Sequence, residues 1–300
     1  MKNKGIKIIL IILLTILIIA LVNFMIYAII NRNNDYSVRF SLIAFGDNTE
    51  KIFEKEYEPG ELDKINIDVS SSNVSIEKAN IDKIKITAYG DKEEKINETV
   101  NNNELSITKN KMRVFIFAMF YWCDEKIIIQ IPNNYDGEFD IHTSSGDIAV
   151  PNLENNVINL ETSSGKIECG NINNGNFKSS SGDITVGNGN EITIQTSSGS
   201  IIAGDFNKLS AEASSGKIDI NKIEEYCNLV TTSGSIEIDS LNITENSNIN
   251  SKSGDVDIRS INDIYIETET GSGDADVKNN NRMAEIVLKI TTTSGSIKVD

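Results

Sequence analysis

Histidine is almost missing from this chain of 300 residues, which contains only His142. A metal site built from several histidines is therefore excluded, and a catalytic triad that depends on histidine is not expected. His142 alternates with Ile141 and Thr143, so we expect its side chain to face solvent. The sequence also lacks a glycine-rich phosphate loop, a CxxC pair and an HExxH sequence. These absences predict a protein that is not an enzyme and that binds no cofactor, a calcium ion excepted.

Cysteine is scarce too. The three cysteines, Cys123, Cys169 and Cys227, cannot make an even framework of disulfides. Cys169 and Cys227 fall at inward positions of a repeating pattern, about three coils or roughly 14 Å apart, which is beyond the reach of a disulfide. We therefore interpret both as small, buried apolar residues.

Positive charge is in short supply, with 28 lysines and arginines against 44 aspartates and glutamates and a formal net charge of −16. This balance argues against binding to nucleic acid and against docking onto anionic lipid. It suits an ectodomain that stays clear of an anionic membrane surface.

What the sequence has in abundance is one repeated phrase, made of a short Ser/Thr run, a glycine, a polar residue and two aliphatic positions one residue apart. It occurs nine times, at spacings of 17 to 22 residues. A period this short is typical of a solenoid of stacked coils. Serine beside glycine also occurs in nucleophile elbows, but nine near-identical copies favour turn chemistry. The repeated glycines are Gly146, Gly165, Gly182, Gly199, Gly216, Gly234, Gly254, Gly273 and Gly295.

Each copy of the phrase predicts two strands. Numbered from the glycine, positions +2 and +4 are apolar and +3 is usually polar, while −7 and −5 are apolar in most copies, which is the alternation of strands with one buried face. The predicted fold is all-β, a parallel β-solenoid of about nine to ten short two-strand coils, about 45 Å long at the spacing of neighbouring strands. We expect the glycines to supply positive φ at the corners, and the hydroxyl groups to bond freed backbone groups there.

Two stretches before the regular repeats are less uniform. Residues from Leu62 to Ile76 predict a degenerate first coil in which Asn73 stands where the glycine would be. Met112–Trp122 (MRVFIFAMFYW) holds a density of aromatic residues found nowhere else in a chain that is 6% aromatic. Two interpretations are open: a cap over the N-terminal end of the core, or an exposed apolar loop that touches a partner or the membrane.

The N-terminal region predicts a membrane anchor. Residues 8–30 are interrupted only by Thr15 and Asn23 among polar types, and this length suffices to cross a bilayer as a helix. Three lysines precede the run, so we expect a cytosolic N-terminus and an extracytoplasmic C-terminal domain on a single-pass protein of the cell membrane. A cleaved signal peptide is the rival interpretation, but its apolar core is normally shorter. The predicted divisions are 1–7 cytosolic tail, 8–30 transmembrane helix, 31–61 stalk, 62–135 irregular coils and cap, and 136–300 regular repeats.

Acidic residues recur at outward positions of the later copies. Stacked carboxylates about 5 Å apart repel each other, and bound Ca²⁺ would relieve the repulsion. The alternative is a solvated acidic face without a metal. The candidate calcium ligands are Asp219, Glu237, Asp257 and Asp276 at +3, and Asp255 and Asp274 at +1.

The ensemble of "LDKINIDVSSSNVSI", "IIIQIP" before "FDIHTSSGDIAV", and serial units such as "TSSGKIEC" and "TTSGSIEI" resembles a bacterial domain family of unknown function named "putative adhesin". The resemblance covers about residues 62–300. It implies a β-solenoid ectodomain of the cell envelope, in some members associated with envelope stress, and it carries no catalytic residues.

These observations favour a membrane-anchored, non-catalytic interaction or scaffold module whose partner is an unidentified envelope protein or glycan. The alternative is a cell-wall protein that binds or cleaves glycans, which for cleavage would need convergent acids in a groove. A third hypothesis is a regulator that signals through a membrane partner.

Overall fold

In the computed structural model, the described residues are 15, 16, 18–20, 22, 37–40, 49–92, 94–109, 113–116 and 124–300, with 37–40 and 113–116 described as backbone only. The chain divides into two compact units, one of residues 1–49 and 110–123 and the other of residues 50–109 and 124–300. The second unit contains all the repeats.

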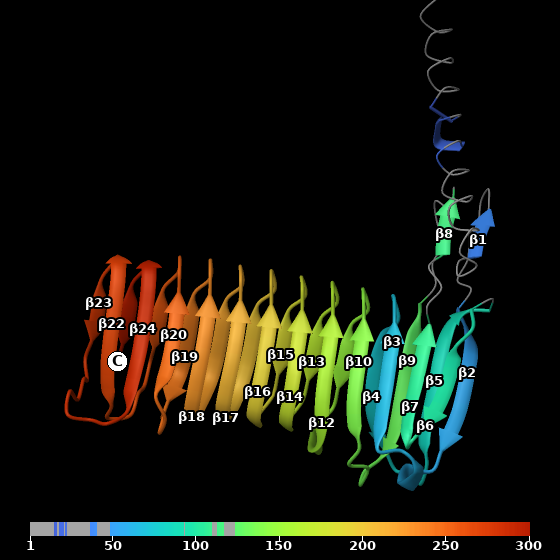
Figure 1. Ribbon diagram of the computed structural model, residues 1–300, viewed down its shortest axis with the longest axis horizontal. Coiled ribbons are helices and arrows are strands. Elements are labelled where there is room, and N and C mark those ends of the chain that lie inside the picture. Colours follow the sequence, from blue (N-terminus) through green and yellow to red (C-terminus); the bar gives the residue numbers. More distant parts are fainter. Residues whose placement is uncertain are drawn as a thin grey trace, which may run out of the picture. The chain divides into compact units, whose positions relative to one another are not determined.

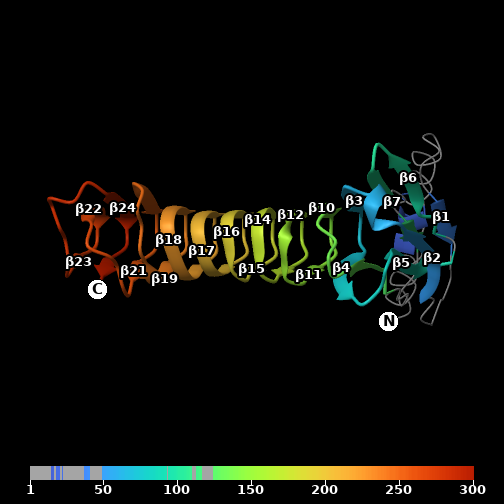
Figure 2. The same cartoon turned by 90° about the horizontal axis from the view of Figure 1, so that it is seen from below.

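The repeats fold as a parallel stack in which each coil contributes a longer and a shorter strand (Figure 1). For example, β12 (Leu153–Thr162) is followed by β13 (Ile167–Cys169), and each pairs in register with its counterpart in the next coil. The longer strands make one sheet, here called the long-strand face, and the shorter strands make the opposite short-strand face (Figure 2). The all-β repeat architecture predicted from the sequence is confirmed.

The long-strand face contains β3 (Lys64–Val69), β7 (Glu104–Lys109), β10 (Glu138–Thr143), β12, β14 (Ile172–Ser179), β16 (Gly189–Thr196), β20 (Ser247–Ser251), β22 (Tyr265–Ser272) and β24 (Val287–Ser294). The short-strand face contains β4 (Asn73–Ala79), β9 (Lys126–Pro132), β11 (Ile148–Val150), β13, β15 (Ile184–Val186), β19 (Ile236–Leu241), β21 (Val256–Ile258), β23 (Ala275–Val277) and β25 (Ile297–Val299). Two long strands, β17 (Ile201–Ala213) and β18 (Ile218–Thr231), run through both faces.

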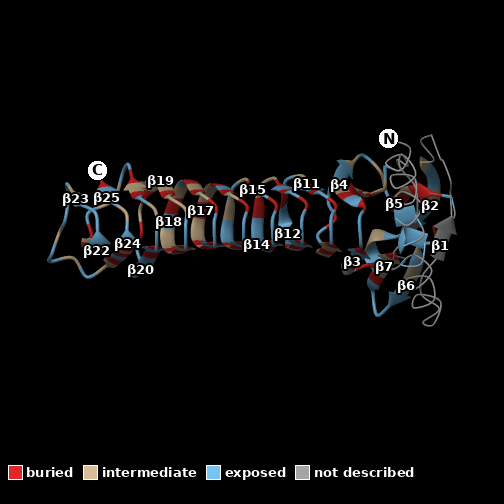
Figure 3. Cartoon of the chain, turned by 90° about the horizontal axis from the view of Figure 1, so that it is seen from above, coloured by how far each residue is buried: buried red, intermediate tan, exposed pale blue. Residues whose placement is uncertain are grey.

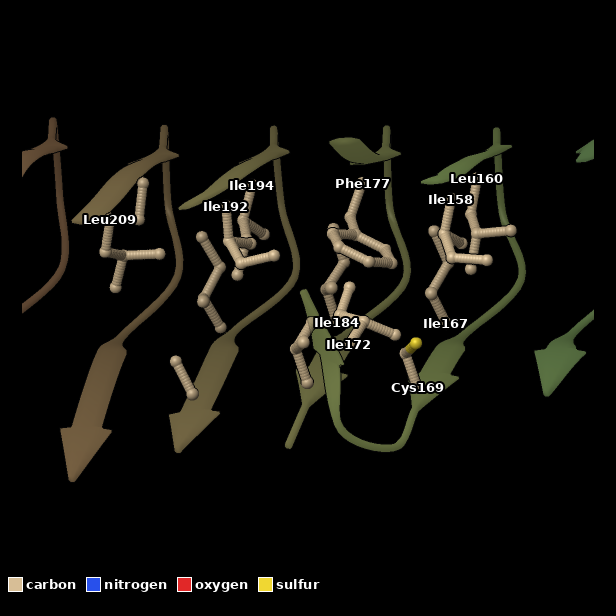
Figure 4. Packing of buried hydrophobic residues seen from close by; sticks show 14 of the residues in the cluster. Ile158, Leu160, Ile167, Cys169, Ile172, Phe177, Ile184, Ile192, Ile194 and Leu209 are labelled. Carbon is tan, nitrogen blue, oxygen red and sulfur yellow. The ribbon is translucent and has the colours of Figure 1, made fainter. Parts of the chain in front are cut away.

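The predicted inward positions form the core, as the alternation of buried and exposed residues along the coils shows (Figure 3). A further inward column, at position +7, also enters the core. Elsewhere in the core, a large side chain fills the space beside a glycine: Phe177 at position −5 lies next to Gly175 at position −7, among the aliphatic residues of neighbouring coils (Figure 4). The +7 column comprises Leu153, Ile172, Gly189, Phe206, Ile223 and Leu241.

The hydroxyl at position −3 ties each corner to the next coil. Thr162 Oγ1 donates a hydrogen bond to the carbonyl oxygen of Gly146 at 3.2 Å and accepts one from the N–H of Gly165 at 3.0 Å. The carbonyl and the N–H are both buried at the corner, where a polar group without a hydrogen bond is costly. The hydroxyl therefore stabilises the turn between the two strands. The predicted role of the Ser/Thr run is therefore confirmed at this position. The hydroxyls that donate in this way are Thr143, Thr162, Ser179, Thr196, Thr231, Ser251, Thr270 and Thr292.

The glycines are required for a different reason from the one predicted. Among the glycines of the described residues, only Gly273 has a positive φ, +146°. A Cβ on Gly182 would instead lie 1.7 Å from the carbonyl oxygen of Gly165 in the neighbouring coil, which is far inside van der Waals contact. The prediction of positive φ was thus wrong for the other repeat glycines: they allow backbone to stack directly on backbone.

The C-terminal coils do not stack in sequence order. β24 pairs with β20 on one side and β22 on the other, and β25 lies likewise between β21 and β23. The last repeat therefore occupies the place next to the Gly254 coil, and the earlier β22–β23 coil forms the end of the stack (Figure 1).

Side-chain polarity explains this order. The inward positions of the β24–β25 coil are aliphatic and buried, for example Leu288 and Ile297. Those of the β22–β23 coil include Thr268, Thr270 and Ala275, which are half-buried or exposed. An apolar coil gains more by being covered on both sides, whereas a polar coil can end the stack in water.

At the other end, the stack continues past the first regular repeat. The coil of β3 and β4 packs between the β10–β11 coil and the β7–β9 coil, which confirms the degenerate first coil. Thr143 Oγ1 donates to the carbonyl oxygen of Ser72, so Ser72 and not Asn73 takes the place of the glycine. Asn73 Oδ1 accepts a hydrogen bond from the N–H of Asp147, as the residue after a glycine does elsewhere.

Antiparallel strands cover this end of the stack. β5 (Ile84–Asp91) pairs with β9, β6 (Asn97–Asn101) pairs with β7, and β2 (Thr49–Tyr57) pairs with β5. The aromatic segment Met112–Trp122 lies mostly outside the described residues. Its described part, β8 (Arg113–Ile116), pairs in parallel with β1 (Ser37–Phe40), and both strands belong to the unit of residues 1–49 and 110–123. A capping role for this segment stays a prediction.

The predicted transmembrane stretch 8–30 lies largely outside the described residues. Its described members, at 15, 16, 18–20 and 22, are helical, and their large apolar side chains are about half exposed. Within the described residues, no helix has the length and apolarity needed for a bilayer span.

Candidate interaction surface

The outward residues of the long-strand face form a continuous uncharged column. At position −6, six successive coils present an amide or a hydroxyl, and strand register places each directly beside the next. All six side chains are exposed or half-buried. We call this set the amide column, and it consists of Asn159, Asn176, Thr193, Ser210, Asn228 and Asn248.

The amide column is partly self-bonded. Asn176 Nδ2 donates to Asn159 Oδ1 at 2.9 Å, and Asn159 Nδ2 donates to Glu138 Oε1 at 3.3 Å. Around these two amides the surface forms a shallow hollow of about 200 Å³. Leu160 and Phe177 are the apolar residues of its lining, and the polar ones are Asp140, Asn159, Glu161, Asn176, Lys178, Thr193 and Gln195.

Charged residues flank the column in pairs of opposite sign. Lys178 Nζ lies 3.5 Å from Glu161 Oε1, and Lys208 Nζ lies 2.7 Å from Glu245 Oε1. The hydrogen bond to Glu245 raises the pKa of Lys208, which therefore stays protonated. These exposed pairs contribute little stability, but they compensate the positive charges beside the column.

His142 lies beside this surface and is 43% exposed, which agrees with the predicted solvent-facing position. Its Nδ1 lies 3.1 Å from Asp68 Oδ1 of the neighbouring coil.

The short-strand face carries the acidic residues proposed as calcium ligands. Asp219, Glu237 and Asp257 are neighbours in register, as predicted. Asp276 is separated from them, because the inserted last coil places Lys298 between Asp257 and Asp276. The sequence could not reveal this interruption, since it follows from the order of the coils.

Basic side chains engage the acidic column. Lys217 Nζ lies 2.9 Å from both Asp219 and Glu237, and these hydrogen bonds raise the pKa of Lys217. Arg259 reaches Glu237 at 3.4 Å, and Lys298 lies 3.7 Å from Asp257. The like charges are thus interleaved with cations, which reduces the repulsion that a metal ion was expected to relieve.

The two candidates at position +1 differ. Asp255 Oδ1 accepts a hydrogen bond from the N–H of Ser296 at 2.7 Å and so joins two coils. Asp274 is exposed in the terminal coil. In the part of the chain that the structure describes, no group of three or more His, Cys, Asp or Glu side chains could hold a metal ion. The calcium site stays a prediction.

A family profile gives the decisive comparison, because it matches residues 62–224 and again 188–300, which together include every repeat. The chain belongs to the Toastrack DUF4097 family. This membership confirms the resemblance to an adhesin-like family of unknown function. No curated protein matches the chain.

Three crystal structures resemble this Toastrack protein. One is a putative adhesin from Parabacteroides merdae ATCC 43184, with 14% identity and a TM-score of 0.51, covering 89% of this chain and 100% of that one. A putative adhesin from Bacteroides fragilis NCTC 9343 has 18% identity, a TM-score of 0.43 and coverages of 85% and 100%. A putative cell adhesion protein from Clostridium sporogenes ATCC 15579 has 13% identity, a TM-score of 0.25 and coverages of 84% and 98%. At these identities, the Parabacteroides structure supports the fold alone.

The Toastrack stack also contains a buried charged cluster that sequence patterns did not indicate. Lys109 Nζ lies 2.7 Å from Glu94 Oε2 and 2.6 Å from Glu125 Oε2, and its side chain is 6% exposed. Burial alone would raise the pKa of Glu125, but the hydrogen bond and charge of Lys109 outweigh it and lower that pKa. Lys109 occupies the inward −3 position of its coil, where it is the register partner of Val69.

The cysteines behave as interpreted where they are described. Cys169 and Cys227 are both buried and free, and burial raises the pKa of each thiol to about 12. Both thiols are therefore protonated and unreactive at neutral pH. Cys123 lies outside the described residues.

Proposed function

We propose that this Toastrack protein is a membrane-anchored, extracytoplasmic and non-catalytic interaction module of the bacterial cell envelope. The observation that carries the proposal is the amide column, an extended polar surface held at fixed spacing by the coil register. Such a surface offers many equivalent contacts along one line, which suits adhesion or scaffolding of an elongated partner.

The apolar stretch 8–30 supports the anchored position. The excess of acidic residues supports an ectodomain that extends away from an anionic bilayer. A link to envelope stress responses is part of the same proposal and rests on the resemblance to the family alone.

Two experiments test this function in intact cells. The first labels single cysteines introduced at Ser200 and Lys4 with a membrane-impermeant reagent, in a background without the native cysteines. We expect labelling at Ser200 only, and labelling at Lys4 alone would contradict the topology. The second inserts a photo-crosslinking residue at Asn176 and identifies the captured material. Capture of an envelope protein or a glycan is expected, and capture of lipid alone would contradict an interaction module.

A further inference from the structure

The amide column carries no charge, and this indicates what kind of ligand it can bind. Asp140 precedes it and Lys289 follows it in register, but the six residues between them carry no charge. By contrast, the corresponding +3 column of the short-strand face is charged in each of its last coils, at Asp219, Glu237, Asp257, Lys298 and Asp276. In a chain in which 24% of residues are charged, this neutral line points to an uncharged ligand.

The hydrogen-bonding capacity of the column remains partly unused. An asparagine amide has two N–H donors and a carbonyl oxygen with two lone pairs. The bond from Asn176 to Asn159 uses one donor of the first and one acceptor position of the second. Each coil therefore still presents both donors and acceptors outward, which is the pattern that sugar hydroxyl and acetamido groups complement.

The spacing of the column also fits a polymer of sugars. Neighbouring coils are about 4.8 Å apart. This distance is close to the length of one pyranose ring, so a glycan chain lying along the stack would meet one amide or hydroxyl per sugar. The hollow around Asn159 and Asn176 provides a place where one ring can sit lower against the surface.

An aromatic ring lies at the side of the column. Tyr226 is two residues before Asn228 on β18, so both side chains project from the same face, and Tyr226 is half-buried. The face of a pyranose packs well against such a ring, because an aromatic side chain offers a rigid apolar surface with a polar tip.

An anionic polymer fits the same surface less well. The flanking lysines Lys178 and Lys208 are already paired with Glu161 and Glu245. The net charge of −16 adds a general repulsion of polyanions.

We propose that the amide column, with Tyr226, is a binding site for uncharged, β-linked polysaccharide of the cell envelope, such as chains that contain N-acetylhexosamine. The inference rests on the proposed function and specifies its partner. The ligand lies parallel to the stack, and amide and hydroxyl groups of successive coils bond its hydroxyl and acetamido groups.

The test is calorimetric titration of the full chain, in phosphatidylcholine nanodiscs, with the β-1,4-linked hexamer of N-acetylglucosamine. We expect saturable binding that changes little between roughly 0.05 M and 0.5 M salt, because no charges pair. The triple variant Asn159→Ala, Asn176→Ala, Asn228→Ala should weaken binding by at least about tenfold, equivalent to roughly 1.4 kcal/mol. Tyr226→Ala should also weaken it.

The matched control is Asn221→Ala, because Asn221 is an exposed amide that donates to Asp205 away from the amide column. This variant should bind as the parent does, and melting curves establish that all variants are folded. Absence of binding by the parent, or equal binding by the triple variant, would overturn the site. If the hexamer fails while photo-crosslinking captures an envelope protein, this inference is wrong and the proposed function stands. If neither finds a partner, both are wrong.

Discussion

Lys109 at the end of β7 and Glu125 just before β9 are joined by an ion pair of 2.6 Å, so the two ends of segment 110–123 are held together. Glu94 approaches the same ammonium group, and Ser72 Oγ lies 3.4 Å from it. The cluster occupies the corner next to Ser72, where the regular coils would place another glycine. Ser72, which takes the place of the glycine, is buried there, and its hydroxyl lies within 3.5 Å of both Lys109 Nζ and Glu125 Oε2.

Replacing Lys109 by methionine should destabilise the stack strongly. The substitution leaves Glu94 and Glu125 buried without their shared cation, and loss of one partner of a buried pair typically costs about 3–5 kcal/mol. We expect a value near the lower end, because the Glu125 side chain is 19% exposed. Urea unfolding of the full chain measures it. Lys51→Met is the control, since the exposed pair of Lys51 and Glu54 should contribute far less to stability than the buried cluster. Equal losses in both variants would contradict the assignment.

The same cluster should make stability depend on acid. The folded state lowers the pKa of Glu125 below its unfolded value, so its contribution is present above the unfolded pKa and is lost as pH falls through the folded pKa. With an ordinary glutamate near 4.5, the melting temperature should fall as the pH drops below that value. Glu125→Gln should show a shallower fall over this window. Parallel pH profiles for parent and variant would show that Glu125 contributes nothing to it.

Replacing a corner glycine by alanine should lower the stability of the stack, although the backbone angles at most of these glycines suit any residue. In Gly182→Ala, the new Cβ would lie 1.7 Å from the carbonyl oxygen of Gly165, so two coils must move apart. Overpacking typically costs about 1–3 kcal/mol, and contact with backbone should place this case at the upper end or above. Gly60→Ala is the matched control, because no atom lies within 4 Å of its Cβ position. Thermal melting of both variants tests the explanation, which fails if they are equally stable.

The order of the C-terminal coils can be tested by disulfide trapping. Asp257 and Lys298 are register partners, whereas Asp257 and Asp276 have Lys298 between them. Cysteines at 257 and 298 would have Cα atoms about 5 Å apart, within disulfide range, and those at 257 and 276 about 10 Å apart, beyond it. Oxidation should crosslink only the 257/298 pair, as seen by the altered mobility of the unreduced chain on a denaturing gel. Crosslinking of 257/276 alone would support sequence order.

Calcium should affect a variant more than the parent. Lys217 and Lys298 lie among the acidic residues, so the parent should show little change in melting temperature with Ca²⁺ or a chelator. Lys217→Gln with Lys298→Gln removes these cations, which should lower the melting temperature slightly and let Ca²⁺ restore it. Magnesium at equal ionic strength controls for screening. A large shift with Ca²⁺ in the parent would establish the site predicted from the sequence.

Several features of the stack followed from the sequence because they repeat. The nine spaced glycines, the apolar pairs at +2 and +4 and the hydroxyl at −3 recur in register. Because neighbouring coils pair strand to strand, equivalent positions have the same environment in each coil and so require the same type of residue. The inward column at +7, with Leu153 and Phe206, is also apolar in most copies of the sequence. The apolar positions −7 and −5 mark only the last part of the longer strand, which in the structure begins as early as +7, as β12 does at Leu153.

The sequence by itself determined the kind of fold, since alternating apolar and polar residues at a short period can bury their apolar side only by stacking. Only the tertiary structure decided which coils are neighbours. It placed the apolar last repeat between the β20–β21 coil and the polar β22–β23 coil, and so set Lys298 between Asp257 and Asp276. It also buried Lys109 beside Glu94. The order of the coils depends on contacts between residues far apart in the chain. The free energy of folding then depends on which coil is exposed to solvent at the end of the stack, and local spacing in the sequence does not determine this.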